Sequence, residues 1–182
     1  MIISTWLLKK TWKNTFLSKD LFTYVRNVIF CVWFFFSGNN LWTLPKAVFC
    51  SLSSLNSLDL SGNFIQDVSD LGFASSQLNS CRIPLRNLDL SHNSLSTLAS
   101  KAFGQLKKLE WLNLASNNLN VMDDDALGNL HSLLHLNMAH NRFVALAPDL
   151  LHEAKYLQVC MYNLCHIFNG TRIIQIHKYP HT

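Results

Sequence analysis

Leucine and asparagine recur along most of the chain in a fixed pattern. The segment Leu55–Ile65 (LNSLDLSGNFI) carries a leucine, an LxL pair, an asparagine and a final apolar residue. Three later segments keep this order with apolar substitutions only, so that each fits LxxLxLxxNxL: Leu85–Leu95, Leu109–Leu119 and Leu133–Phe143. Self-similarity of this kind indicates a repeat architecture, and it governs the fold more than any single residue does.

The repeat has a period of 24 residues. Its asparagines fall at Asn39, Asn63, Asn93, Asn117 and Asn141, in steps of 24, 30, 24 and 24. One further step of 24 reaches Cys165, inside a degenerate sixth unit. The six extra residues of the second step fall between Phe73 and Leu85, and we expect them to bulge on the convex side, because an insertion on the other side would interrupt strand pairing.

Each LxL pair predicts a short strand. Successive side chains of a strand point to opposite faces, so Leu58 and Leu60 should point inward and Asp59 outward. Stacked units then form a parallel sheet on one face. The chain returns along the other side through a second apolar column, which consists of Phe49, Phe73, Phe103, Leu127 and Leu151. One unit cannot bury its own apolar face, so stability requires at least ~3 stacked units.

The repeated asparagine has a structural interpretation. The chain turns sharply after each strand and leaves main-chain N–H and C=O groups facing the interior, where they cannot reach water. A carboxamide supplies two donors and an acceptor on a short side chain, whereas aspartate would lack the donors and add a buried charge. We therefore predict a ladder of structural asparagines at Asn39, Asn63, Asn93, Asn117 and Asn141.

Together these motifs resemble the leucine-rich repeat family, over about residues 39–167. The 24-residue period is similar to the typical class found in extracellular proteins and in receptor ectodomains such as those of Toll-like receptors. The resemblance implies an α/β-type solenoid, a right-handed horseshoe arc with a short parallel β-sheet on its concave face. It also implies about five to six units in this chain.

The outward strand positions are the candidate partner-binding surface. Adjacent strands lie about 4.8 Å apart, so equivalent positions form continuous columns on the concave face. Trp111 is the leading candidate, because tryptophan is enriched at binding hot spots; the alternative is that it only packs between Asn87 and His135. The predicted surface comprises Asp59, Asn87, Asp89, Trp111, Asn113, His135 and Asn137.

The segments outside the repeats differ in character. Residues 1–38 are predicted to be a leader, a signal peptide or signal anchor, because basic residues precede the nine-residue apolar run Val28–Phe36. That run is much shorter than the roughly 20 apolar residues of a bilayer-spanning helix. A strand or helix packed on the N-terminal edge of the repeats, or an imprecise gene end, are the alternatives. Residues 168–182 form a C-terminal tail.

Charge and motifs narrow the chemistry. The net charge is +4, and residues 1–40 supply all of it, with five basic residues and one acid. The neutral remainder argues against nucleic-acid binding. No catalytic motif, cofactor motif or metal-ligand spacing occurs, so we expect no enzyme, no cofactor and no metal site. The histidines His92 and His140 are two strands apart, and Asp123–Asp125 is expected to be a solvated turn.

These observations predict a protein-binding module of a secreted or cell-surface protein. Membrane association is expected only through the N-terminal apolar segment. An intracellular scaffold or regulatory subunit in the cytoplasm is the alternative, and a targeting fragment of a larger receptor or kinase is the second. Asn169-Gly-Thr fits the N-glycosylation rule. The five cysteines are an odd number, so at least one has no partner within the chain.

Overall fold

The computed structural model describes residues 33–44, 49, 52–74, 83–143, 146, 147, 149–161, 175 and 176. Most of the predicted leader, residues 75–82 of the insertion, the cysteine at the sixth asparagine position and the glycosylation candidate Asn169 lie outside these residues. The described residues thus comprise the repeats and the strands at their two ends.

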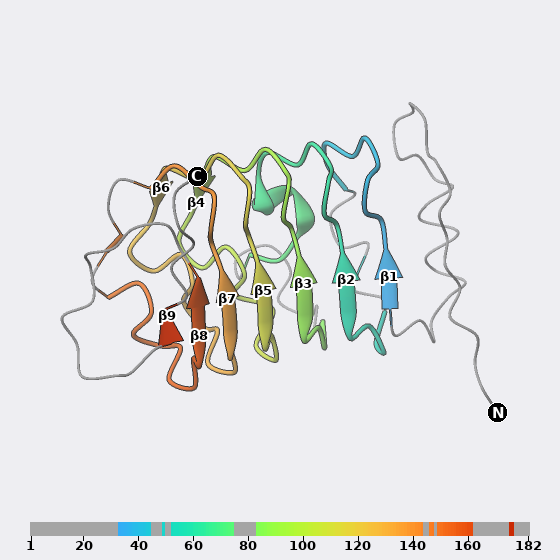
Figure 1. The fold of residues 1–182 in the computed structure, drawn as a ribbon. Coiled ribbons are helices and arrows are strands. Elements are labelled where there is room, and N and C mark those ends of the chain that lie inside the picture. The colour runs from blue at the N-terminus through green and yellow to red at the C-terminus, as the bar shows by residue number, and fades with distance from the viewer. Residues whose placement is uncertain are drawn as a thin grey trace.

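Short parallel strands form one layer along the whole described chain (Figure 1). The seven-stranded sheet has the order β1-β2-β3-β5-β7-β8-β9, and every neighbouring pair is parallel. Its strands are β1 (Trp33–Phe35), β2 (Ser57–Asp59), β3 (Asn87–Asp89), β5 (Trp111–Asn113), β7 (His135–Asn137), β8 (Val159–Met161) and β9 (Gln175–Ile176). The predicted LxL strands at β2, β3, β5 and β7 are thus present.

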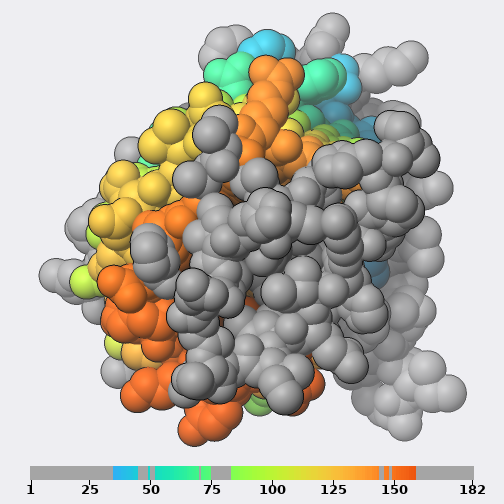
Figure 2. All heavy atoms as spheres, turned by 60° about the vertical axis from the view of Figure 1, so that its left-hand side comes forward, coloured from blue at the N-terminus to red at the C-terminus, as the bar shows by residue number. Residues whose placement is uncertain are grey.

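The return side of each unit contains little regular structure. A two-stranded parallel sheet joins β4 (Thr97–Leu98) to β6 (Val121–Met122). The 3-10 helix η2 (Val68–Leu71) begins after Asp67, whose carboxylate accepts a hydrogen bond from the Ser69 N–H, and it ends at Gly72. The other described residues of this side lie mainly in turns and irregular segments. The units stack through the parallel strand layer as a solenoid. Seen from its end, the later units lie in front of the first ones (Figure 2).

The core lies between the strand layer and the return side. The LxL leucines are almost fully buried, as the alternation predicts, and so is the second apolar column. Its first two rings, Phe49 and Phe73, stack with centroids 5.7 Å apart. Phe103 continues this column with no exposed area. Because each of these side chains fills the space between two units, burial ties neighbouring units together.

The repeated asparagines connect neighbouring units through the main chain. The Asn117 Oδ1 atom accepts from the Leu95 N–H at 3.0 Å. The Nδ2 group donates to the Leu90 carbonyl at 2.9 Å and to the Leu114 carbonyl at 3.0 Å. Asn63, Asn93 and Asn141 make the equivalent bonds, each to its own unit and to the preceding one. Both donor and acceptor functions of the carboxamide are therefore used.

Four carbonyls of this ladder each serve two asparagines. The Phe36 carbonyl accepts from Asn39 and Asn63, and the Leu60 carbonyl from Asn63 and Asn93. The Leu90 and Leu114 carbonyls do the same for the asparagines that follow. The full pattern of bonds, with Oδ1 as acceptor, runs through Asn63, Asn93, Asn117 and Asn141.

The sheet begins inside the segment assigned to the leader. β1 pairs in register with β2, Trp33 opposite Ser57 and Phe35 opposite Asp59. Phe36 is buried, and its N–H donates to the Asp59 carbonyl at 2.7 Å. The last residues of the apolar run therefore form the LxL strand of a first unit, with phenylalanine in place of leucine. No helix within the described residues is long and apolar enough to cross a membrane.

The sheet also continues into the predicted tail. β9 pairs with β8, and Gln175 lies opposite Val159. The separation of these two positions, 175 − 159 = 16 residues, is shorter than the 24-residue period. β9 is therefore an added edge strand rather than another full repeat.

The turn before each ladder asparagine has a left-handed backbone. Gly38, Gly62, His92, Ser116 and His140 all have φ between 55 and 65°. At Gly62, φ is 63° and an added Cβ would approach the Gly38 nitrogen to 3.3 Å. The Gly62 N–H meanwhile donates to the Ser91 carbonyl at 2.9 Å, which fixes the turn against the next unit.

Gly62→Ala should therefore lower the free energy of unfolding by about 1–2 kcal/mol, the cost of a side chain in the left-handed region. Ser116→Ala is the matched control, because this position already carries a Cβ at a φ of 56°, and it should change stability by less than about 0.5 kcal/mol. Urea unfolding measures both variants. Equal losses in the two would contradict the assignment.

Candidate functional site

The outward residues of the strands form two aligned columns, which we call the strand face. The first column runs through Ser57, Asn87, Trp111 and His135, and the second through Asp59, Asp89, Asn113 and Asn137. All eight side chains are partly exposed. The seven predicted site residues are thus brought together on β2, β3, β5 and β7, with Ser57 beside them. This is the face that the sequence places on the concave side.

Each side chain of the second column bonds to its own main chain. The Oδ1 atom accepts from the N–H two residues later, at 2.9 Å for Asp59, 2.8 Å for Asp89, 3.2 Å for Asn113 and 3.1 Å for Asn137. Such local turns are a general habit of Asp and Asn. One oxygen of every member is therefore occupied structurally, and only the remaining atoms of these groups are available to a partner.

The Asp89 carboxylate is further anchored. Its Oδ1 accepts from the Ser91 hydroxyl at 2.6 Å, and its Oδ2 accepts from the Asn113 amide at 3.1 Å. The second of these bonds joins β3 to β5. The columns are therefore held in one geometry before any partner arrives, which lowers the entropic cost of binding.

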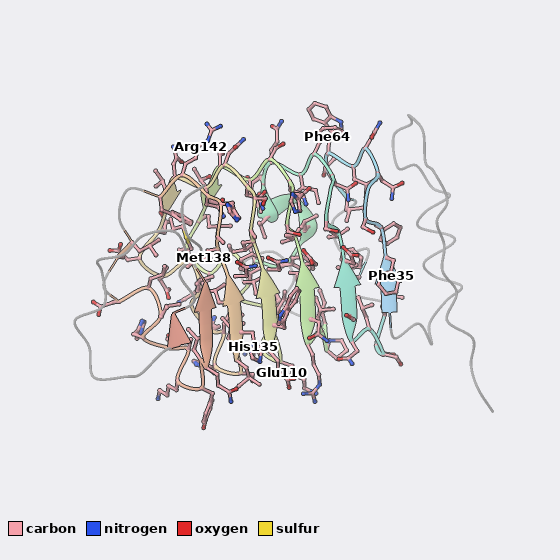
Figure 3. The ribbon with its side chains drawn as sticks, viewed as in Figure 1. Phe35, Phe64, Glu110, His135, Met138 and Arg142 are labelled. Carbon is pink, nitrogen blue, oxygen red and sulfur yellow. The ribbon has the colours of Figure 1, made fainter. Side chains whose placement is uncertain are left out.

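The first column places Trp111 between Asn87 and His135 on neighbouring strands. Trp111 is half-buried, so its ring is less available than an isolated outward tryptophan would be. Just before it, Glu110 forms an ion pair with Arg86. Figure 3 shows Glu110, just before β5, and His135, the first residue of β7, near the lower ends of these two strands. Trp111 and His135 thus lie beside the Arg86–Glu110 ion pair, in which the two charges compensate each other.

Sequence reasoning missed three exposed aromatic residues at the N-terminal end. Phe35 extends the second column on β1 and is 39% exposed. Trp42 is 61% exposed and Phe64 45%, and their ring centroids are 5.7 Å apart. Phe64 stands directly after a ladder asparagine, where other units have Ser94, Asn118 or Arg142. An aromatic residue at a position that is polar in the other units could have been recognised from the sequence as a candidate contact. Figure 3 shows Phe64 and Arg142 at the same upper edge of the solenoid.

The acidic run has a structural role. Asp123 accepts from the Ser100 N–H at 2.8 Å, and Asp125 pairs with Lys101 at 3.3 Å. Both contacts tie a turn to the preceding unit. Within the part of the chain that the structure describes, no three His, Cys, Asp or Glu side chains lie together in a way that could hold a metal ion.

Comparison with known proteins supports the repeat assignment. The leucine rich repeat family model matches residues 83–143. Similar solved structures include Toll from Drosophila, in its complex with Spatzle, at 20% identity and a TM-score of 0.60, covering 68% of this chain and 16% of that one. TLR13 bound to ssRNA13 is similar at 23% identity and a TM-score of 0.62, covering 78% of this chain and 20% of that one.

The chain thus spans a fifth or less of the length of these two receptors. At such identities the likeness concerns the fold, and it agrees with the parallel strand layer and the asparagine ladder described above. Residues 83–143 thus match the leucine rich repeat family, and the described strand layer is a solenoid with the fold of the Toll and TLR13 structures.

Proposed function

We propose that this chain is a protein-binding module of a secreted or cell-surface protein, and that it holds its partner on the strand face. The observation that carries the proposal is the alignment of Asn87, Trp111 and His135 beside the Asp and Asn column on consecutive strands. A rigid sheet presents these groups at fixed spacing, which suits recognition. None of them forms a nucleophile and base arrangement, and the module is proposed to have no enzymatic activity.

The charge of the strand face favours a protein partner over a nucleic acid. Toll is bound to Spatzle and TLR13 to an RNA in the structures that resemble this chain. Nucleic-acid binding requires a basic surface to neutralise phosphates. On the strand face the acids Asp59 and Asp89 stand without a matching cation among the described ion pairs. We therefore favour a protein partner over a nucleic acid.

Trp111→Ala should lower the affinity for the partner at least about tenfold, because half-buried tryptophans at an interface centre are common hot spots. The full chain is immobilised, proteins are captured from the medium and surface of cells that express it, and the affinity of the captured protein is measured for each variant. His135→Ala, on the neighbouring strand, should also weaken it. Tyr156→Ala is the control, an aromatic that is 68% exposed but lies off the strand face.

Circular dichroism and urea unfolding must first confirm that each variant is folded, since Trp111 also contributes packing. An affinity unchanged by both Trp111→Ala and His135→Ala would move the site away from the strand face. If Tyr156→Ala weakens binding as strongly, the capture reflects general stickiness of aromatic residues instead.

Export is the second part of the proposal and has its own test. Mass spectrometry of the mature protein reads its N-terminus and any glycan on Asn169. Because β1 pairs with β2 and Phe36 is buried, a cut that keeps the whole sheet must lie before Trp33. A processed N-terminus there, with a glycan, supports a secreted or cell-surface protein. An intact Met1 without glycan favours the intracellular scaffold, and a longer transcript favours a fragment of a larger receptor or kinase.

A further inference from the structure

The second column of the strand face changes its charge along the solenoid. Asp59 on β2 and Asp89 on β3 lie opposite each other in the register, and Asn113 and Asn137 continue the column on β5 and β7. Parallel strands are about 4.8 Å apart, and like charges on directly opposite residues destabilise a sheet. Two neighbouring carboxylates therefore carry an energetic cost at this place.

The fold does not require the charge of Asp59. Asn113 and Asn137 accept the N–H of Ala115 and Ala139 with their Oδ1 atoms, and this is the same bond that Asp59 and Asp89 make to Ser61 and Ser91. Asp89 is bonded further, because its carboxylate also accepts from the Ser91 hydroxyl and the Asn113 amide. An amide oxygen would supply the turn bond of Asp59 as well as a carboxylate does, so the negative charge of Asp59 needs another explanation.

No cation of the described residues neutralises the pair. Arg86 precedes β3 but is engaged by Glu110, and Lys101 by Asp125. The remaining ion pairs join His131 and His152 to Glu153. The strand face described here therefore carries two acids that no cation of the described residues pairs with.

Resting on the proposed function, we propose that the strand face docks a basic, extended segment of a protein partner, with an arginine or lysine side chain over Asp59 and Asp89. Arginine suits this place well, since its planar fork binds carboxylate oxygens in pairs. Phe35 is next in the column and is 39% exposed. Trp111 and His135 then contact the segment further along.

The test uses the full chain and three defined probes. These are an unstructured peptide in which three arginines alternate with serine, the same peptide with glutamate for arginine, and a single-stranded RNA of twelve nucleotides. The arginine peptide should bind, more weakly as salt is raised, and the glutamate peptide and the RNA should not. Calorimetry or fluorescence anisotropy reports each affinity.

The decisive variant is Asp59→Asn, because asparagine keeps the bond to the Ser61 N–H and removes only the charge. Asp89 is left unchanged, since asparagine there would also remove the acceptor of the Asn113 amide. Asp59→Asn should bind the arginine peptide about tenfold more weakly, as expected for the loss of a charge-assisted hydrogen bond, with a melting temperature equal to or above that of the original chain. Asp124→Asn is the control, with the same charge change at an exposed position off the strand face. It should leave the affinity unchanged.

Several outcomes would overturn the inference. They are no binding of the arginine peptide, equal weakening by Asp59→Asn and Asp124→Asn, or tighter binding of the RNA. If the arginine peptide fails to bind while Trp111→Ala still weakens binding of the captured protein, the strand face remains the site and only the basic character of the segment is refuted.

Discussion

Replacing Phe103 with alanine is expected to lower the free energy of unfolding by about 3–5 kcal/mol. The ring has no exposed area and stands in the column begun by the stacked Phe49 and Phe73. Removing it leaves a cavity between two units, and the stack depends on contacts between neighbours because no unit has a core of its own. Urea unfolding followed by circular dichroism measures the loss.

The chain supplies the control for this prediction. The next two units place Leu127 and Leu151 where the earlier ones place phenylalanine, and both leucines are buried. Phe103→Leu should therefore cost less than about 1.5 kcal/mol, as is usual when a core substitution nearly conserves volume. A Phe103→Ala variant as stable as Phe103→Leu would show that the column is not tightly packed.

Asn117→Ala is expected to lower the free energy of unfolding by about 1–3 kcal/mol. The substitution leaves the buried Leu95 N–H without its acceptor, and it removes one of two donors from the Leu90 and Leu114 carbonyls. A methyl group cannot replace either function, and bulk water has little access to this interior position, where Asn117 is 5% exposed. Thermal and urea unfolding both report the change.

Asn118→Ala is the neighbouring control. Asn118 is exposed, and its substitution should alter stability by no more than about 0.5 kcal/mol. The two variants have the same change in composition at adjacent positions. Similar stabilities for both would therefore contradict the hydrogen-bonding role of the ladder.

The fold was predictable because its pattern is redundant. Four copies of LxxLxLxxNxL fix the strands, the inward leucines and the asparagine turns without reference to any single residue. Strand register follows from the pattern too, since a shift by one residue would turn every leucine outward. The family resemblance then added the arc, in agreement with the likeness to Toll and TLR13.

The ends of the sheet were harder to predict. In β1 the LxL positions are held by Phe34 and Phe36, which are also the last residues of the apolar run that predicts a signal core. The asparagine count already included Asn39, whose unit needs a strand six to four residues before it, so the register itself pointed to β1. Nothing comparable marks β9, which departs from the 24-residue period.

The candidate site was predictable in position but only partly in chemistry. Alternation placed seven residues on one face, because outward direction depends only on register. It could not show that an oxygen of Asp59 or Asn113 accepts a hydrogen bond from the N–H two residues later. Nor could it show the half-burial of Trp111, which depends on the size of side chains on two adjacent strands.

The sharing of each carbonyl by two asparagines has a consequence for how such a chain changes in length. Asn93, Asn117 and Asn141 are interchangeable partners, so a gene duplication or deletion of one complete period rejoins the ladder with every donor matched to an acceptor. An insertion of any other size must be absorbed in a loop outside the ladder. The number of units can thus change without leaving a donor or acceptor of the ladder unpaired.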